Sequence, residues 1–223
     1  MSPPEKTAYT AHVPEPCFEK VQILFRDEHL LVINKPAGLL SVPGRVVKDC
    51  VLNRMLVDFP EVRTVHRLDL DTSGLMILAL SQKATSDLNR QFRERTIKKD
   101  YEAIVYGCLE NEEGEIDFPI RADPENRPLQ IVDFDEGKAS LTRYQVMSFE
   151  ESYSRIRLMP VTGRSHQLRV HLAAIGHPIL GCDLYAHEEA YKAGSRLNLH
   201  ASKLRFDHPE TNEFLTFESV PPF

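Results

Sequence analysis

Short runs of β-favouring residues recur along the chain, and this pattern constrains the fold more than any other feature of the sequence. Some of these runs alternate apolar and polar side chains, as residues 153–158 do, which is typical of a sheet with one face in water. The runs cover Val21–Phe25, Leu30–Asn34, Leu75–Leu80, Tyr101–Tyr106, Leu141–Phe149, Arg155–Met159 and Phe214–Phe217. A chain of 223 residues with this many strands can build one sizeable domain or two small lobes that share a sheet.

Three segments between these runs have helical character. Apolar residues repeat at four-residue spacing over 84–92 and at similar spacing over 168–175, where Gly176 and Pro178 would end the helix. Val51–Val57 is a weaker third helix. Because strands and helices mix without a regular βαβ alternation, the sequence predicts an α+β domain around a mixed, mainly antiparallel sheet.

The first twenty residues differ from the rest of the chain. They have no apolar period and carry four prolines, so we expect an irregular arm over residues 1–20 and one domain over residues 21–223. The arm has neither the apolar core of a signal peptide nor the Arg-rich pattern of a transit peptide. The longest apolar run, Leu75–Leu80, is too short to span a bilayer. We therefore expect no membrane association.

The four cysteines point to a reducing compartment. They lie far apart, at positions 17, 50, 108 and 182, and form no CxxC pair. Disulfide frameworks need denser cysteines and zinc sites need local pairs, so the sequence favours free thiols and a cytoplasmic protein.

Charge is unevenly distributed along this acidic chain. The net charge of −6 argues against a nucleic-acid partner. However, Ser81–Tyr101 has six Lys/Arg against three Asp/Glu, and Arg155–Arg205 has eight against three. The acidity gathers in stretches such as residues 110–115, where we expect a solvated loop. A basic binding face and ordinary solvated surface charge are both compatible with this pattern.

The first candidate site is the segment Val65–Gly74, where a His, an Arg and two Asp crowd into six positions before an apolar strand. Catalytic groups concentrate in loops held between rigid elements. Asp69 could serve as nucleophile or general base if a cation keeps it ionised. The alternative is a polar turn whose side chains satisfy backbone amides, and from spacing alone such turns are the commoner case.

The second candidate site is Thr162–His171, which we expect to contain a helix start at Arg164. The rigid guanidinium fork of Arg164 could pair with a carboxylate. Metal binding is the rival interpretation. His166 and His171 lie five residues apart, about 140° round a helix, which is a poor ligand geometry beside i, i+4 spacing. We therefore predict ordinary hydrogen-bonded histidines and no metal.

The third candidate is Lys98–Tyr101, where the basic helix would pass into a strand. Tyr101 could stack on a base or lie in the core as a strand aromatic, and the sequence alone favours the core. No phosphate loop, Rossmann glycine triplet or serine-nucleophile elbow occurs in the chain, so nucleotide cofactors and acyl-enzyme chemistry lack support.

Taken together, these segments resemble the RluA family of pseudouridine synthases. The resemblance rests on five blocks in family order: Val32–Leu39, His66–Asp69 with Thr72–Gly74, Lys99–Tyr101, Gly163–His171, and Leu199–Ala201 with His208–Pro209. It extends from about Val21 to Phe223. A small departure is Cys182, where an Asp directly after the glycine is usual, and it leaves the catalytic assignments unchanged. Many relatives carry an S4-type RNA-binding domain before the catalytic domain, and we expect none here.

The resemblance implies a role for each matching residue. Asp69 corresponds to the catalytic aspartate, Arg164 to the basic residue that pairs with it, and Tyr101 to a tyrosine that lies against the target base. Leu168 would line the pocket, and Arg67 would help to displace the target nucleotide. For RNA contact we expect the basic residues Arg90, Arg93, Lys98 and Lys99.

The same resemblance implies the function. It predicts an enzyme that isomerises uridine to pseudouridine in structured RNA, needs no cofactor and acts as a monomer. The substrate would be a 23S rRNA hairpin, a tRNA anticodon stem-loop, or both. Two other classes stay open. A non-catalytic RNA-binding module would explain the basic stretches but not why Asp69 lies beside Arg67 and apart from those stretches. A metal-dependent hydrolase would need ligands that the histidine spacing does not offer.

Overall fold

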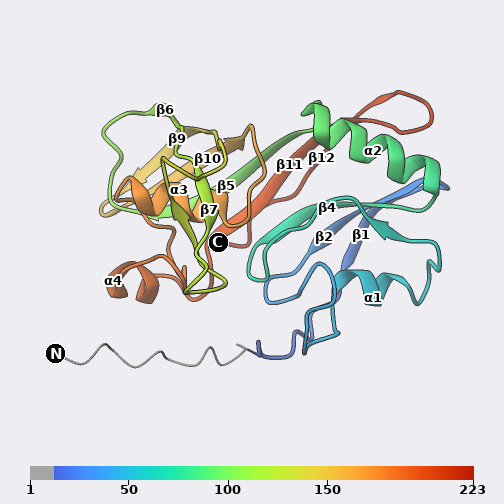
Figure 1. Cartoon of the computed structure of the whole chain (residues 1–223), viewed down its shortest axis with the longest axis horizontal. Coiled ribbons are helices and arrows are strands. Elements are labelled where there is room, and N and C mark those ends of the chain that lie inside the picture. The colour runs from blue at the N-terminus through green and yellow to red at the C-terminus, as the bar shows by residue number, and fades with distance from the viewer. Residues whose placement is uncertain (1–12) are drawn as a thin grey trace.

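One sheet runs through the whole of the computed structural model, which describes residues 13–223 (Figure 1). Within these residues ten strands pair in the order β1-β2-β4-β11-β5-β10-β9-β6, with β12 beside β11 and β3 beside β4. The ten strands are β1 (Gln22–Arg26), β2 (Leu30–Lys35), β3 (Arg63–Thr64), β4 (Ser73–Ala79), β5 (Lys98–Tyr106), β6 (Glu113–Ile116), β9 (Thr142–Glu150), β10 (Tyr153–Pro160), β11 (Leu199–Asp207) and β12 (Phe214–Glu218). The predicted α+β class with a mixed, mainly antiparallel sheet is confirmed.

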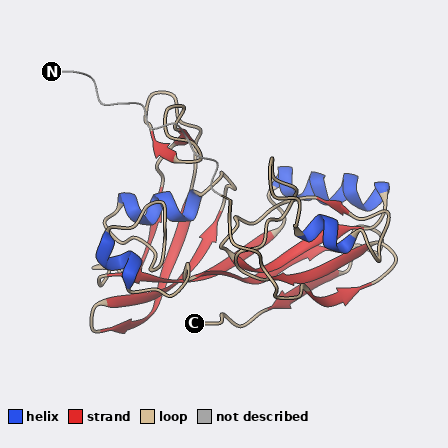
Figure 2. Cartoon of the chain, turned by 90° about the horizontal axis from the view of Figure 1, so that it is seen from below, coloured by secondary structure: helices blue, strands red, loops and turns tan. Residues whose placement is uncertain are grey.

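The remaining elements lie around this sheet. A separate hairpin consists of β7 (Ile120–Ala122) and β8 (Gln130–Val132), and the helices are α1 (Val51–Met55), α2 (Gln82–Glu94), α3 (Gln167–Ala174) and α4 (Glu188–Lys192). Figure 2 shows the strands extending from one end of the molecule to the other, with helices at both ends. No helix within residues 13–223 is long and apolar enough to cross a membrane.

The sheet is divided into two lobes, and β5 and β11 cross between them (Figure 1). In the first lobe both faces of β2 are covered, because Leu31 and Ile33 pack in a core cluster with α1 while Leu30 and Val32 pack in a second cluster with α2. This double burial explains why β2 and β4 are continuous apolar runs rather than alternating ones. In the second lobe, α3 packs with β5 and β10 in a further cluster.

The two lobes meet where β4 and β11 pair in parallel. Ser73 and Gly74 of β4 lie opposite His200 and Ala201 of β11. Gly74 has φ 111°, and a Cβ there would lie 2.4 Å from the carbonyl oxygen of Ala201. Only glycine permits this approach. Because β4 begins at Ser73, the predicted catalytic loop before it enters the sheet at the junction of the lobes.

Some elements differ from those the sequence predicts. The nine-residue strand β11 was not predicted as a strand, because buried polar residues such as His200 and Ser202 interrupt its apolar pattern. The expected loop over residues 110–115 is wrong in its second half, where β6 forms an edge strand against β9. Of the predicted N-terminal arm, residues 13–20 form neither helix nor strand, and residues 1–12 lie outside the described residues.

Candidate active site

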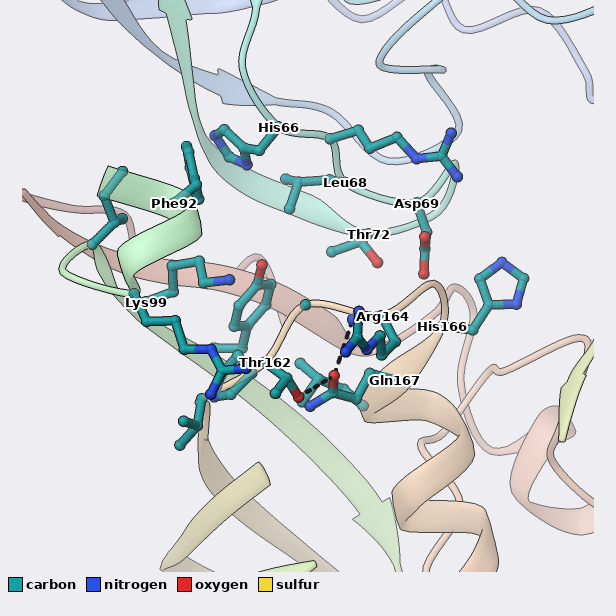
Figure 3. Close-up of a pocket in the computed structure, with 18 of the residues that line it drawn as sticks. His66, Leu68, Asp69, Thr72, Phe92, Lys99, Thr162, Arg164, His166 and Gln167 are labelled. Atoms are coloured by element: carbon teal, nitrogen blue, oxygen red, sulfur yellow. Dashed lines mark hydrogen bonds between the residues drawn. The ribbon is translucent and has the colours of Figure 1, made fainter. Parts of the chain in front are cut away.

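A cavity of about 490 Å³ lies where the two lobes meet (Figure 3). Three segments contribute most of its lining: residues 65–69 with Thr72 before β4, the end of α2 with the start of β5, and residues 160–164 with 166–169 leading into α3. Leu199 of β11 also lines it. This volume lies within the ordinary range of ligand pockets. All three segments singled out in the sequence therefore meet at one site, as do the residues Arg67, Asp69, Tyr101, Arg164 and Leu168.

The cavity is strongly basic although the chain is acidic. Among the described residues that line it, the cations are Arg67, Arg93, Arg95, Lys99, Arg164 and Arg169, and the carboxylate is Asp69. Charges near a cavity act on its contents much more than distant surface charges do, because water and salt screen the distant ones. The net charge of −6 thus gives no information about this site.

The loop that carries Asp69 is bound by Ser41, which lies in the segment after β2. Ser41 Oγ donates to the carbonyl oxygen of Leu68 at 2.7 Å and accepts from its backbone N–H at 3.0 Å. The Leu68 side chain is buried in the first lobe. The half-buried Asp69 follows, and Figure 3 shows it projecting toward the wall that carries Arg164, His166 and Gln167.

A second anchor for this loop is Lys35, whose side chain is completely buried. Its Nζ donates to the carbonyl oxygens of Pro36, Leu39 and Leu70, at 2.8, 2.7 and 2.9 Å. An ammonium has three donors, so all of them are used. Burial lowers the pKa of Lys35 to about 7, against the opposing influence of the Asp71 and Asp69 carboxylates.

Tyr101, on β5, is both a core residue and a cavity residue. It packs against the core clusters of both lobes and also lines the cavity. Burial, together with the charge of Asp69, raises the pKa of its hydroxyl well above the usual value. The two interpretations that the sequence offered for Tyr101 are therefore compatible, and its phenol is neutral near pH 7.

The opposite wall is organised by Gln167, the first residue of α3. Its Oε1 accepts from Thr162 Oγ1 at 2.7 Å and from the Arg164 backbone N–H at 3.0 Å (Figure 3). The preceding residue, His166, is the N-cap and has φ 55°. The prediction that the helix begins at Arg164 is wrong by three residues, because these side-chain bonds hold residues 162–166 in a loop.

Two arginines of this wall have very different surroundings. Arg164 is exposed, and its guanidinium donates to the carbonyl oxygen of Ala139 at 3.3 and 3.4 Å. No ion pair joins it to Asp69 in the part of the chain that the structure describes. Arg169, on α3, is only 3% exposed and lines the cavity. Burial opposes its charge, but Cys182, Asp183 and Asp69 raise the pKa of Arg169 above its usual value.

The sequence analysis did not select Arg169, although a signal for it exists. Arg169 lies between Leu168 and Val170 on a helix whose other predicted contacts are apolar. An arginine in such a segment must either reach water or have buried partners. This pattern alone could have marked it.

Comparison with known proteins identifies the family of the chain. Residues 29–174 match the family model described as RNA pseudouridylate synthase. The chain belongs to the RNA pseudouridylate synthase family. The enzyme is therefore an RNA pseudouridine synthase, as the resemblance implied.

Relatives and solved structures agree with this assignment. The chain is 50% identical over 204 residues to a dual-specificity RNA pseudouridine synthase RluA from Yersinia pestis, covering 90% of this chain and 99% of that one. Identity to the protein of the same name from Escherichia coli K12 is 47% over 204 residues, covering 90% and 93%. Human RNA pseudouridylate synthase domain containing 1 superposes with a TM-score of 0.80 at 30% identity, covering 95% of this chain and 87% of that one.

The basic residues that we expected to contact RNA divide into two groups in this pseudouridine synthase. Arg93 and Lys99 line the cavity, and so does Arg95. Arg90 and Lys98 are not among the described lining residues. Arg90 instead pairs with Asp87 at 2.5 Å and with Glu94 at 2.8 Å. The i, i+3 and i, i+4 spacing of these charges was visible in the sequence.

His166 and His171, the two histidines weighed as metal ligands, form hydrogen bonds within the pseudouridine synthase. His171 bonds to Thr142 Oγ1 and to the carbonyl oxygen of Phe118, both at 2.9 Å. His166 Nδ1 lies 2.6 Å from the Tyr185 hydroxyl. In residues 13–223 no group of three or more His, Cys, Asp or Glu side chains could hold a metal ion.

The anchoring role of Lys35 can be tested with Lys35→Met. We expect unfolding free energy to fall by about 3 kcal/mol or more, because three carbonyls lose their donor and each buried unsatisfied group costs about 1–3 kcal/mol. Lys48→Met is the matched control, since Lys48 also donates to two carbonyls, of Gly44 and Arg45, but is exposed. Denaturant unfolding measures both. Equal losses in the two variants would contradict the anchor.

A comparison of wild type with Lys35→Met at several pH values tests the pKa of Lys35. Its folded-state pKa of about 7 lies below the ordinary 10.5, so between these values the unfolded chain binds more protons than the folded one. The contribution of Lys35 to stability therefore increases as pH rises through this window. We expect the stability difference between wild type and Lys35→Met to grow from pH 7 to about pH 10.

Proposed function

We propose that this pseudouridine synthase isomerises uridines in the loops of RNA hairpins, in 23S rRNA, in the anticodon arm of tRNA, or in both. The observation that carries the proposal is the cavity itself, whose lining among residues 13–223 has one carboxylate, Asp69, and six Lys or Arg side chains around a volume of about 490 Å³. The names of the similar bacterial proteins, which include the words dual-specificity, support two RNA classes as substrates. Loop bases are already partly unstacked, so extruding one costs less than extruding a paired base.

In this proposal Asp69 is the catalytic residue. The N1–C1′ bond of uridine breaks, the base rotates, and C5 bonds to C1′ and then loses its hydrogen as a proton. N1 gains a proton, so the reaction is an isomerisation that needs no oxidant and no imported group. A carboxylate beside C1′ can stabilise positive charge on the sugar, attack it, or remove a proton from it. Any of these roles requires Asp69 to be ionised.

Arg169 is the cation that serves as the partner of Asp69 in this proposal. Its support is its burial at the cavity wall and the charge of Asp69, which contributes to raising the pKa of Arg169. The pairing of Arg164 with Asp69, which the resemblance implied, stays a prediction. The exposed position of Arg164 and its bonds to Ala139 fit a contact to the RNA backbone better.

Tyr101 lies against the target base in this proposal. Its raised pKa means that the phenol does not act as a base near neutral pH, so it supports the base by stacking or by donating a hydrogen bond. Arg67, which is exposed at the cavity, would occupy the space that the displaced nucleotide leaves.

The role of Asp69 is tested by Asp69→Asn. This change removes the charge and keeps the shape, so we expect folding and RNA binding to be retained while the rate falls by at least about a hundredfold. The measurement is tritium release from hairpin RNA labelled at uridine C5. Asp58→Asn, which removes an exposed carboxylate, is the control. Release by Asp69→Asn within tenfold of wild type would refute the assignment.

The partner of Asp69 is tested by comparing Arg169→Lys with Arg164→Lys. Both changes keep the charge and remove the guanidinium fork. We expect Arg169→Lys to lower kcat by about tenfold or more with little change in KM, because it disturbs an interaction used in the chemical step. Arg164→Lys should chiefly raise KM. The opposite result would restore Arg164 as the partner.

The RNA contacts are tested by measuring how the affinity for a stem-loop of about 15–20 nucleotides depends on salt concentration. This length fits the modest footprint of a single module. We expect full activity on this RNA and binding that weakens steeply with salt. Arg93→Ala should reduce the salt slope by about one unit, because each released phosphate contact contributes about that much. Arg90→Ala is the matched control, because two carboxylates already neutralise Arg90.

Two results would contradict this proposal. Equal slopes for Arg90→Ala and Arg93→Ala would show that the cavity does not decide which cations contact RNA. Activity confined to ribosomal particles, with no release from any short stem-loop, would show that a partner surface supplies recognition.

A further inference from the structure

The buried guanidinium of Arg169 forms hydrogen bonds with the two residues that follow Gly181. Its Nε and Nη2 both lie 3.3 Å from Cys182 Sγ, and Nη2 also donates to Asp183 Oδ1 at 2.5 Å. The Tyr185 ring lies 5.3 Å from the guanidinium carbon. One edge of the fork is thus fixed by the thiol sulfur, while the guanidinium as a whole lines the cavity.

We infer that Cys182 is a positioning residue of the isomerisation, whose sulfur accepts two guanidinium N–H groups and so aims Arg169 at the catalytic cavity. The inference rests on the role proposed above for Arg169. It gives a function to a free thiol to which the sequence assigned none.

The relative burial of the two acceptors identifies Cys182 as the fixed one. Cys182 is 1% exposed, whereas the side chain of Asp183 is 42% exposed. Water therefore screens and competes for the Asp183 carboxylate, and its contact restrains Arg169 less than its short distance suggests. The sulfur has no such competition, and two N–H groups on one acceptor fix both the position and the plane of the fork.

The remaining nitrogen of Arg169 is the one available to the cavity. Among the described residues, Nε and Nη2 make its hydrogen bonds and Nη1 makes none. A guanidinium held along one edge presents the opposite nitrogen in a defined direction. The charge of Asp69 acts on this same group, so the orientation set by Cys182 reaches the catalytic carboxylate through Arg169.

The alternative is that Cys182 only fills space. It belongs to the core cluster of the second lobe, and a buried cysteine often behaves as a small apolar side chain. The two explanations predict opposite effects of a carboxylate at this position. If the sulfur only packs, an aspartate is worse than an alanine because it buries a charge. If the sulfur holds Arg169, an aspartate restores the acceptor.

The experiment compares Cys182→Ala, Cys182→Ser and Cys182→Asp by tritium release from RNA and by thermal unfolding. We expect Cys182→Ala to lower kcat by about tenfold while KM changes by less than about twofold. Cys182→Asp should keep kcat within about threefold of wild type, and Cys182→Ser should fall between them. The matched control is Ile116→Val, which removes one carbon from the same core cluster without touching Arg169.

Two outcomes would overturn the inference. One is a kcat of Cys182→Ala equal to that of Ile116→Val, and the other is Cys182→Asp less active than Cys182→Ala. Should Cys182→Ala fail to fold, the order of Cys182→Ser and Cys182→Asp decides the question in the same way.

The result is separable from the proposed function. Rates are compared as ratios to wild type on any RNA that supports release, so failure of the short stem-loop leaves the comparison valid. If Arg169→Lys does not change kcat, the proposed role of Arg169 fails and the inference fails with it. If Arg169→Lys lowers kcat and Cys182→Ala does not, only the inference fails.

Discussion

The site depends above all on the buried side chain of Lys35. Lys35 Nζ joins three carbonyl oxygens, two from the loop that follows β2 and one from the loop that carries Asp69. A charge without water is stable only when its donors are all used, so this contact forces two loops distant in sequence to keep one geometry. With Ser41 bonded to both backbone groups of Leu68, it fixes the backbone on either side of Asp69, the proposed catalytic residue.

The junction of the lobes converts this local order into a cavity. The parallel contact of β4 with β11, which needs glycine at position 74, brings the Asp69 loop opposite the segment before α3. The cations of three segments then surround one carboxylate. A chain of net charge −6 can therefore offer RNA a basic site, because binding depends on the charges near the ligand and not on their sum.

Much of the fold and part of the site could be predicted from the sequence. The apolar runs of β2 and β4 and the four-residue period of α2 are local patterns that survive in the structure. Strand β11 was not predicted, since its polar residues are satisfied by tertiary contacts that no local sequence pattern shows. Arg90 was expected to contact RNA because of its charge, and this stays a prediction. The count of charges did not include its ion pairs with Asp87 and Glu94.

The sequence by itself determined the fold class, the three segments that form the site and, through the resemblance of their motifs, the chemistry. These properties are carried by local periodicity and by residue types at fixed spacing. Only the tertiary structure decided which arginine is buried in the wall of the cavity that Asp69 also lines, and that the sulfur of Cys182 contacts this arginine. Burial and counter-charges arise when segments far apart in the chain pack together. The physical reason is that an electrostatic partner is set by distance in space and by exclusion of water, and neither is written in the order of the residues.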